Sequence, residues 1–251
     1  MFGDSIKQIK RHPYYANLSL VTVSAPEVEW AYREAMLLQD TPQVVQPLGV
    51  SRTDAMFDTR FIEQSFRNLY ERIPQAAGKR VLLYAPTYRG RVEGAQPPDA
   101  LDIKQLSSDL GPGWVLLIKH HPFVKDRPPI PAACSRFAYD VSDTMPVDEL
   151  LVTADALVTD YSSVVFEYSL TLRPMSFFAY DLEEYGDWRG FYYPYEEMTP
   201  GPVVRTTREV ADYVKATAGT FDDAEARAFR DKFMSACDGH ATEHIVQAVL
   251  T

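Results

Sequence analysis

The segment Arg80–Ala85, with the sequence RVLLYA, is the stretch from which the fold is most easily deduced. It is a short, continuous apolar run, which is typical of a strand buried on both faces of a parallel sheet. Similar segments are Trp114–Lys119, Ala154–Thr159 and Met175–Ala179, and Arg136–Tyr139 is a weaker one. The stretches between them have helical spacing: Ala100–Leu110, Val147–Thr153 and Ser163–Leu172. Strands that alternate with helices predict an α/β fold with a doubly wound parallel sheet.

The N-terminal part of the chain is predicted to contain both strands and helices, whereas the C-terminal tail is predicted to be helical. Before the first long strand, we predict strands over Leu18–Ser24 and Val44–Leu48 and helices over Pro26–Leu38 and Thr59–Ile73. The tail, Thr207–Leu250, is predicted to be helical with breaks near Gly219 and Gly239. Two strands are too few for an independent sheet. We therefore predict a complete Rossmann-like C-terminal lobe over residues 74–251 and a partial N-terminal lobe over residues 1–73.

Composition excludes several classes of protein. The 251 residues include 25 Lys and Arg against 35 Asp and Glu, a net charge of −10 that argues against non-specific nucleic-acid binding. The two cysteines, Cys134 and Cys237, form no CxxC pair, so we expect buried thiols rather than a disulfide scaffold or a Cys-based zinc site. Neither a run of about 18 apolar residues nor a signal-peptide pattern is present, so we expect a cytoplasmic protein.

Polar residues follow the predicted strands at the edge where doubly wound sheets bind ligands. Thr87 and Arg89 follow the first long strand, and His121 follows the second. Asp160, Ser162 and Ser163 follow the next long apolar run, and Asp181 follows the last. Hydroxyls, a guanidinium and an imidazole suit an anionic ligand, and a helix start can bind phosphate.

Each of these residues also has an ordinary structural role. A serine at a helix start can simply cap it, an arginine can form a surface ion pair, and a histidine can lie in the core. His240 and His244 have a spacing that could suit a metal, but no metalloprotease pattern surrounds them. The sequence contains no P-loop, no GxGxxG after a strand and no GxSxG, which argues against P-loop NTPases, NAD-binding enzymes and serine hydrolases of the elbow type.

Six motifs in the same order give a more specific indication. They are Leu48–Asp54, Leu83–Arg89, Lys119–Pro122, Ala154–Ser163, Tyr180–Tyr185 and Arg189–Tyr192. With Asp238–Gly239 near the end, they resemble the CDP-glycerol glycerophosphotransferase family, the primases and polymerases of teichoic acids and related capsule polymers. The first motif resembles the family pattern G-x-x-R-x-D. The resemblance covers about residues 45–245.

The resemblance implies a GT-B-like pair of lobes, in which the C-terminal lobe binds the nucleotide donor and the N-terminal lobe faces the acceptor. It implies transfer of a glycerol phosphate, or a related polyol or sugar phosphate, from a CDP-activated donor to a polymer hydroxyl, with release of CMP. The donor is then a substrate, and no cofactor or metal is expected. A peripheral contact with the inner face of the membrane and a homo-oligomer are further possibilities that the family raises.

Roles for individual residues follow from the resemblance. Arg89 and His121 are expected to stabilise the diphosphate, and His121 also to assist the departure of CMP. The other residues expected to contact the substrate are Thr87, Thr159, Asp160, Ser162, Ser163, Asp181 and Arg189. Among them, Asp160 is expected to accept from a hydroxyl rather than to face a phosphate, and Arg189 to close over the donor.

The sequence departs from the family pattern in two places. Glu167 stands where the family usually has an aspartate, and the family's W-H-G-x-x-x-K element, whose histidine is thought to be the general base, has no counterpart in these 251 residues. We interpret this as a chain that lacks the N-terminal part of the family and has a donor site without the expected base. Two alternatives stay open, a catalytically silent nucleotide-binding subunit and a GT-B glycosyltransferase that uses a UDP-sugar. Competition between CDP and UDP would separate the second from the main hypothesis.

Overall fold

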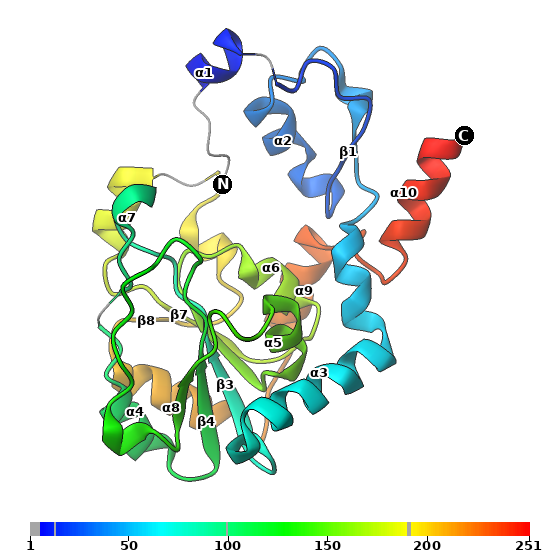
Figure 1. The fold of residues 1–251 in the computed structure, drawn as a ribbon. Coiled ribbons are helices and arrows are strands. Elements are labelled where there is room, and N and C mark those ends of the chain that lie inside the picture. The colour runs from blue at the N-terminus through cyan, green and yellow to red at the C-terminus, as the bar shows by residue number, and fades with distance from the viewer. Residues whose placement is uncertain (1–5, 13, 99, 190–191) are drawn as a thin grey trace. The chain divides into compact units, whose positions relative to one another are not determined.

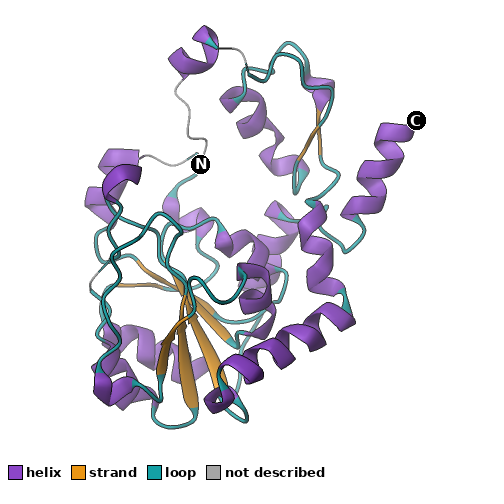
Figure 2. Ribbon diagram, viewed as in Figure 1, coloured by secondary structure: helices purple, strands orange, loops and turns teal. Residues whose placement is uncertain are grey.

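The computed structural model describes residues 6–12, 14–98, 100–189 and 192–251, and the chain forms two compact units. The larger unit, Thr59–Arg227, contains the main sheet and is called the sheet unit below. The other unit combines Met1–Asp58 with Ala228–Thr251 and is called the terminal unit. Figure 1 labels many of the elements of both units, and Figure 2 distinguishes helices, strands and loops.

Within the described residues, the sheet unit is built on a parallel sheet with the strand order β5-β4-β3-β6-β7-β8. The strands are β3 (Arg80–Tyr84), β4 (Trp114–Ile118), β5 (Ala138–Asp140), β6 (Ala156–Thr159), β7 (Met175–Phe178) and β8 (Val203–Val204). Numbered from the first of them, this is the 3-2-1-4-5-6 order of a Rossmann fold. The predicted doubly wound sheet is therefore confirmed, and its direction of winding reverses between β3 and β6.

Helices cover both faces of this sheet (Figure 1). On one face, α4 (Ile103–Leu110) and α8 (Thr207–Thr217) pack together and bury Leu106 and Val210 against alternate strand residues such as Leu82 and Leu116. The helices of the other face are α3 (Thr59–Arg72), α5 (Val147–Thr153) and α6 (Val164–Ser169). Successive strand residues point to opposite faces, so strands buried on both faces must be apolar throughout.

The terminal unit joins the two ends of the chain. Its elements are α1 (Ile6–Arg11), β1 (Val21–Thr22), α2 (Glu29–Ala35), β2 (Val45–Gln46), the end of α9 (Ala224–Phe233), and α10 (Ala241–Leu250). β1 pairs in parallel with β2, and Ser24 accepts a 2.9 Å hydrogen bond from the backbone N–H of Ala236. The Ser24 hydroxyl donates to the carbonyl of Phe233 at 2.7 Å. Contacts between residues more than 200 positions apart thus hold this unit together.

This division differs from the boundary expected after residue 73. The helix α3 belongs to the sheet unit because it packs on α5, where Asn68 Nδ2 donates to Glu149 Oε1 at 3.0 Å. The last 24 residues, Ala228–Thr251, belong with the first part of the chain. Helical spacing fixes an element but does not fix the partner on which it packs.

Most predicted elements are present with slightly shorter bounds. The strand expected over Leu18–Ser24 is reduced to β1, because its pairing with β2 extends over only two residues. The helix expected over Pro26–Leu38 begins as a 3-10 turn, Pro26–Val28, and continues as α2. Neither β8 nor α7 (Leu182–Arg189) was predicted from the sequence. Cys134 and Cys237 are buried free thiols, as expected.

In the part of the chain that the structure describes, no helix has the length and apolar character needed to cross a bilayer.

Candidate functional site at the carboxyl edge of the sheet

The candidate site lies where four neighbouring strands end. β4, β3, β6 and β7 are adjacent in the sheet, and they are followed by His121, by Thr87 and Arg89, by Asp160 to Ser163, and by Asp181, respectively. Parallel strands end at the same edge, so residues from four separate segments converge there. The winding reverses between β3 and β6, which is where open α/β sheets bind ligands.

Arg89 is at the centre of this edge. Its Nε donates to Asp181 Oδ2 at 2.6 Å, and its Nη2 donates to Asp181 Oδ1 at 3.0 Å. Nη2 also lies 3.0 Å from Asp160 Oδ2, and Nη1 donates to the carbonyl of Thr87 at 2.6 Å. The guanidinium is therefore held in a fork by protein acceptors that follow three different strands.

Asp160 is the most enclosed charge of the site, with 2% of its side chain exposed. Its Oδ1 accepts from the backbone N–H groups of Thr87 and Tyr161, both at 2.7 Å. Burial raises the pKa of the Asp160 carboxyl, and the nearby Arg89 charge and the two N–H donors oppose that rise. Its oxygens face Arg89 and the backbone, which leaves Asp160 to organise the loop between β6 and α6.

Four tyrosines surround the Arg89 cluster, and none of them was predicted from the sequence to have a role in the site. The Arg89 guanidinium carbon lies 5.2, 5.7 and 5.4 Å from the ring centres of Tyr161, Tyr180 and Tyr185. Tyr161 stacks on Tyr185 with ring centres 3.7 Å apart, and its hydroxyl donates to Asp181 Oδ1 at 2.8 Å. The Tyr195 hydroxyl donates to the backbone carbonyl of Asp160 at 2.9 Å.

Two of these tyrosines, Tyr161 and Tyr195, are neutral donors. Burial, helped in Tyr161 by the hydrogen bond to Asp181 and in Tyr195 by the Asp160 charge, holds the pKa of both hydroxyls far above the usual range. Tyr180 and Tyr185 belong to the motif Tyr180–Tyr185, which also contains Asp181. Their place in this motif could have indicated that they lie near the site. Nothing in the sequence around Tyr195 indicated its contact with Asp160.

Thr159 and Thr87 face the protein. The Thr159 hydroxyl is fully buried and donates to the carbonyl of Ala85 at 2.7 Å, which links the ends of β6 and β3. Thr87 supplies its N–H to Asp160 and its carbonyl to Arg89. The expected contact of Thr159 with the substrate is thus replaced, in this structure, by a contact within the sheet.

Ser162 and Ser163 lie at the start of α6. The Ser162 hydroxyl accepts from the N–H of Val164 at 3.3 Å, and Ser163, at the N-cap position, makes no side-chain capping bond. The side chain of Ser163 is exposed, and that of Ser162 is half-buried. Both serines are therefore at least partly accessible to solvent.

His121 and His120 have different surroundings. His121 is half-buried between the rings of Tyr88 and Phe123, whose centres lie 4.9 and 4.5 Å away. Its Nδ1 accepts from the backbone N–H of Phe123 at 3.2 Å, so a neutral imidazole carries its proton on Nε2. His120 is buried, and burial lowers the pKa of its imidazole, which keeps this ring neutral.

The two remaining features considered from the sequence are Arg189 and a metal site. The side chain of Arg189, the last residue of α7, lies outside the described residues. Among the side chains that the structure describes, His, Cys, Asp and Glu form no group of three or more that could hold a metal ion. The imidazole of His240 lies 3.5 Å from the Glu243 carboxylate.

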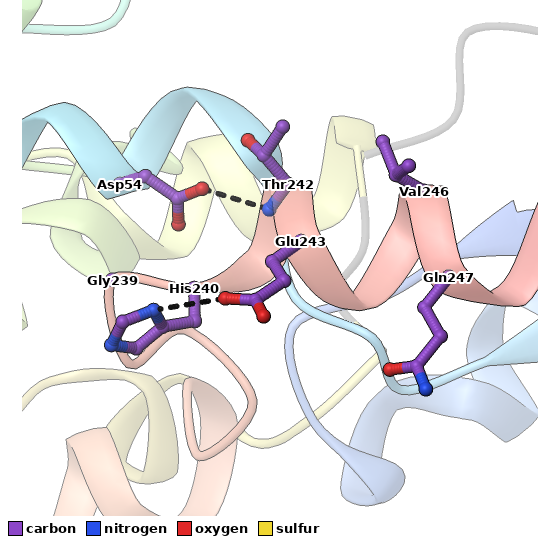
Figure 3. A pocket seen from close by; sticks show the side chains of 7 residues that line it. All are labelled: Asp54, Gly239, His240, Thr242, Glu243, Val246 and Gln247. Atoms are coloured by element: carbon purple, nitrogen blue, oxygen red, sulfur yellow. Dashed lines mark hydrogen bonds and ion pairs between the residues drawn. The ribbon is translucent and has the colours of Figure 1, made fainter.

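A separate, open pocket lies in the terminal unit around the start of α10 (Figure 3). It is lined by Asp54, Gly239, His240, Thr242, Glu243, Val246 and Gln247. Here Asp54 accepts hydrogen bonds from the N–H groups of Ala241 and Thr242, at 2.9 and 2.8 Å. Asp54 of the first motif and Gly239 of the last thus line the same pocket.

Comparison with known proteins agrees with the order of these motifs. A family model described as CDP-Glycerol:Poly(glycerophosphate) glycerophosphotransferase matches residues 5–251. The teichoic acid poly(ribitol-phosphate) polymerase of Bacillus spizizenii is 35% identical over 238 residues, which cover 94% of this chain and 38% of that protein. The teichoic acid ribitol-phosphate primase of the same organism is 32% identical over 252 residues, which cover 99% of this chain and 63% of that protein.

A structure of a variant of the wall teichoic acid polymerase TagF, soaked with CDPG, matches with a TM-score of 0.83 and 26% identity. The match covers 100% of this chain and 62% of that one, and it confirms the predicted GT-B-like α/β class. The chain spans between 38% and 63% of the length of these three relatives. Because the family model matches nearly the whole chain, the protein belongs to the CDP-glycerol:poly(glycerophosphate) glycerophosphotransferase family.

Proposed function

We propose that this chain carries the donor side of a transferase that moves a glycerol-phosphate or ribitol-phosphate unit from a CDP-activated alcohol to a hydroxyl of a cell-wall polymer. The observation that carries the proposal is the convergence of four family motifs on adjacent strand ends at the point where the winding reverses. The relatives supply the substrate class, since they are named as ribitol-phosphate polymerases and primases and a TagF variant was soaked with CDPG.

The proposed reaction is a phosphoryl transfer. The acceptor hydroxyl oxygen bonds to the phosphorus that carries the alcohol, the bond from that phosphorus to the bridging oxygen breaks, and CMP leaves with the bridging oxygen. Charge then builds on the departing phosphate, so donors aimed at it lower the barrier. The acceptor proton must pass to a base, for which we assign no residue of this chain.

His121 and the serines are the donors that we propose for the diphosphate. Because His121 Nδ1 accepts from the N–H of Phe123, the donor of a neutral imidazole is Nε2–H, which we propose to contact a phosphate oxygen. Ser162 and Ser163 can each add a hydroxyl donor at the start of α6. In this arrangement His121 acts as a neutral hydrogen-bond donor, which is one of the two roles expected from the sequence.

No cofactor or metal is part of the proposal, and the CDP-activated alcohol is the substrate. The cytoplasmic location, the peripheral membrane contact and the homo-oligomer stay predictions.

Isothermal titration of the chain with CDP-glycerol, CDP, CMP and UDP tests the donor site. We expect CDP and CDP-glycerol to bind more tightly than UDP, and His121→Ala to weaken both. His12→Ala is the matched control because His12 is exposed and belongs to the terminal unit. Tighter binding of UDP than of CDP would favour the UDP-sugar alternative. Binding of CDP-glycerol without transfer to any polymer acceptor would favour a nucleotide-binding subunit.

A further inference from the structure

The Arg89 guanidinium is occupied by the protein. A guanidinium has five N–H donors, and here Nε, Nη1 and Nη2 all have protein acceptors. Asp181 takes the two-pronged contact that a phosphate would otherwise take. To bind two oxygens of a diphosphate, Arg89 would first have to release Asp181.

The charge balance of the cluster also opposes an anionic ligand. One guanidinium faces two carboxylates, with exposed side-chain fractions of 19% for Arg89, 2% for Asp160 and 16% for Asp181. Desolvation lowers the pKa of Arg89, but the two carboxylates outweigh it and raise this pKa, so the guanidinium stays charged. With both carboxylates ionised, the three side chains have a formal charge of −1, which repels a diphosphate that approaches Arg89.

The aromatic rings complete the enclosure. Tyr161, Tyr180 and Tyr185 lie within 5.7 Å of the guanidinium carbon, and Tyr161 also donates to the same carboxylate that Arg89 grips. Such rings stabilise the cation and reduce its contact with water.

We infer that Arg89 is a positioning residue and not a ligand of the donor diphosphate. Through Thr87, Asp160 and Asp181 it fixes the segments that follow β3, β6 and β7 relative to one another, and so places Ser162 and Ser163. The inference rests on the proposed function, because it concerns the same donor site. It revises the role that the family resemblance implied for this arginine.

The sign of the effect of Asp181→Asn on CDP affinity distinguishes the two roles. If Arg89 were a phosphate ligand, removal of the competing carboxylate would release it and tighten CDP binding. A positioning role predicts the opposite, a weakening of about tenfold, or about 1.4 kcal/mol. Arg89→Gln is expected to weaken CDP to a similar extent, and the double variant no more than the worse single variant. Tighter binding in Asp181→Asn, or losses that multiply in the double variant, would overturn the inference.

The variant Arg89→Lys is a second test of whether Arg89 contacts the diphosphate. Lysine binds phosphate well as a point charge but cannot reproduce the fork to Asp181. We expect Arg89→Lys to lose as much CDP affinity as Arg89→Gln, and substantial rescue by lysine would show a direct contact. Arg80→Gln removes the same charge from the first residue of β3, at the opposite edge of the sheet, and is expected to leave CDP affinity unchanged. If the Arg89 variants do not fold, Asp181→Asn decides by its sign alone.

A melting-temperature cycle separates this inference from the proposed function. The decreases in melting temperature of Arg89→Gln and Asp181→Asn should sum to more than the decrease in the double variant, because both substitutions break the same contact. Additive losses would overturn the inference whether or not nucleotide binds. Failure of the wild-type chain to bind CDP would contradict the proposed function, and the melting cycle would still decide whether Asp181 holds Arg89.

Discussion

Asp54 caps the helix that begins at Ala241. Its Oδ1 accepts the backbone N–H of Ala241 at 2.9 Å, across a sequence separation of 187 residues, and its Oδ2 accepts the N–H of Thr242 at 2.8 Å. The first N–H groups of a helix have no partner within the helix. His240, the residue that precedes α10, makes no side-chain capping bond, so Asp54 takes this role from a distant part of the chain.

Substitution of Asp54 should therefore destabilise the protein. We expect Asp54→Ala to lower the free energy of unfolding by about 1–2 kcal/mol, the range for loss of a helix cap. Denaturation by urea, with an unchanged slope, measures this loss. Asp40→Asn is a matched control, because Asp40 is an exposed aspartate of the same unit. Equal stability of Asp54→Ala and the control would show that the cap contributes nothing.

The same contact should depend on pH. Partial burial raises the pKa of the Asp54 carboxyl, but hydrogen bonds from Thr242 and Ala241 outweigh this effect and hold it below its ordinary value. Stability from a lowered carboxyl pKa is complete above the unfolded-state value, about 3.9, and is lost as the pH falls through the folded-state value. The amides of Ala241 and Thr242 should lose protection from hydrogen exchange below about pH 4.

Asp54→Asn is the control for this experiment, because it keeps one oxygen acceptor and cannot titrate. Its exchange protection at the two amides should be lower than that of the wild type at pH 6 and should change less as the pH falls. An equally steep decline in both proteins would assign the pH dependence to other groups.

Gly49 should not tolerate a side chain. It has a φ of +88°, and a Cβ built on it would overlap the Ala236 carbonyl oxygen and lie 2.6 Å from Ala241 Cβ. Gly78 has a similar φ of +74° with nothing within 4 Å of such a Cβ. Gly78→Ala should therefore lower the free energy of unfolding by about 1 kcal/mol, from backbone conformation alone. Gly49→Ala should lower the free energy of unfolding by about 1–3 kcal/mol more than Gly78→Ala does, because the added methyl group overpacks the site.

Urea denaturation of the two glycine variants makes this comparison. Their difference measures how closely the first motif approaches α10, because the conformational cost is nearly the same in both. Equal losses of stability would mean that the terminal unit relaxes to accept the methyl group.

His121 should bind its ligand as a neutral donor. His121→Ala should weaken CDP binding by about 1.5–3 kcal/mol, the scale of a hydrogen bond to a charged group. His121→Gln keeps an amide N–H donor at a similar reach and should recover part of the loss. Titration calorimetry checks both variants, and a glutamine variant as weak as the alanine variant would contradict the donor role.

The pattern of apolar runs was sufficient to predict the sheet. Segments such as Arg80–Ala85 and Trp114–Lys119 contain apolar runs that are too short for a buried helix but suit a strand buried on both faces, and this is a local property. The strand ends were therefore predictable, and with them the placement of Arg89, His121, Asp160 and Asp181 at one edge. The two-residue strand β8 was not, because it is too short to show a period, and β1 was predicted as a longer strand than the structure contains.

The sequence by itself thus determined the fold class, the family and the residue types at the candidate site. Only the tertiary structure decided how those residues pair: Arg89 with Asp181 and Asp160, Thr159 with Ala85, and Asp54 with Ala241. Sequence patterns report which face or end of an element a side chain occupies. The partners that meet across 92 or 187 residues are decided by strand order and helix packing, which bring distant segments within hydrogen-bonding distance.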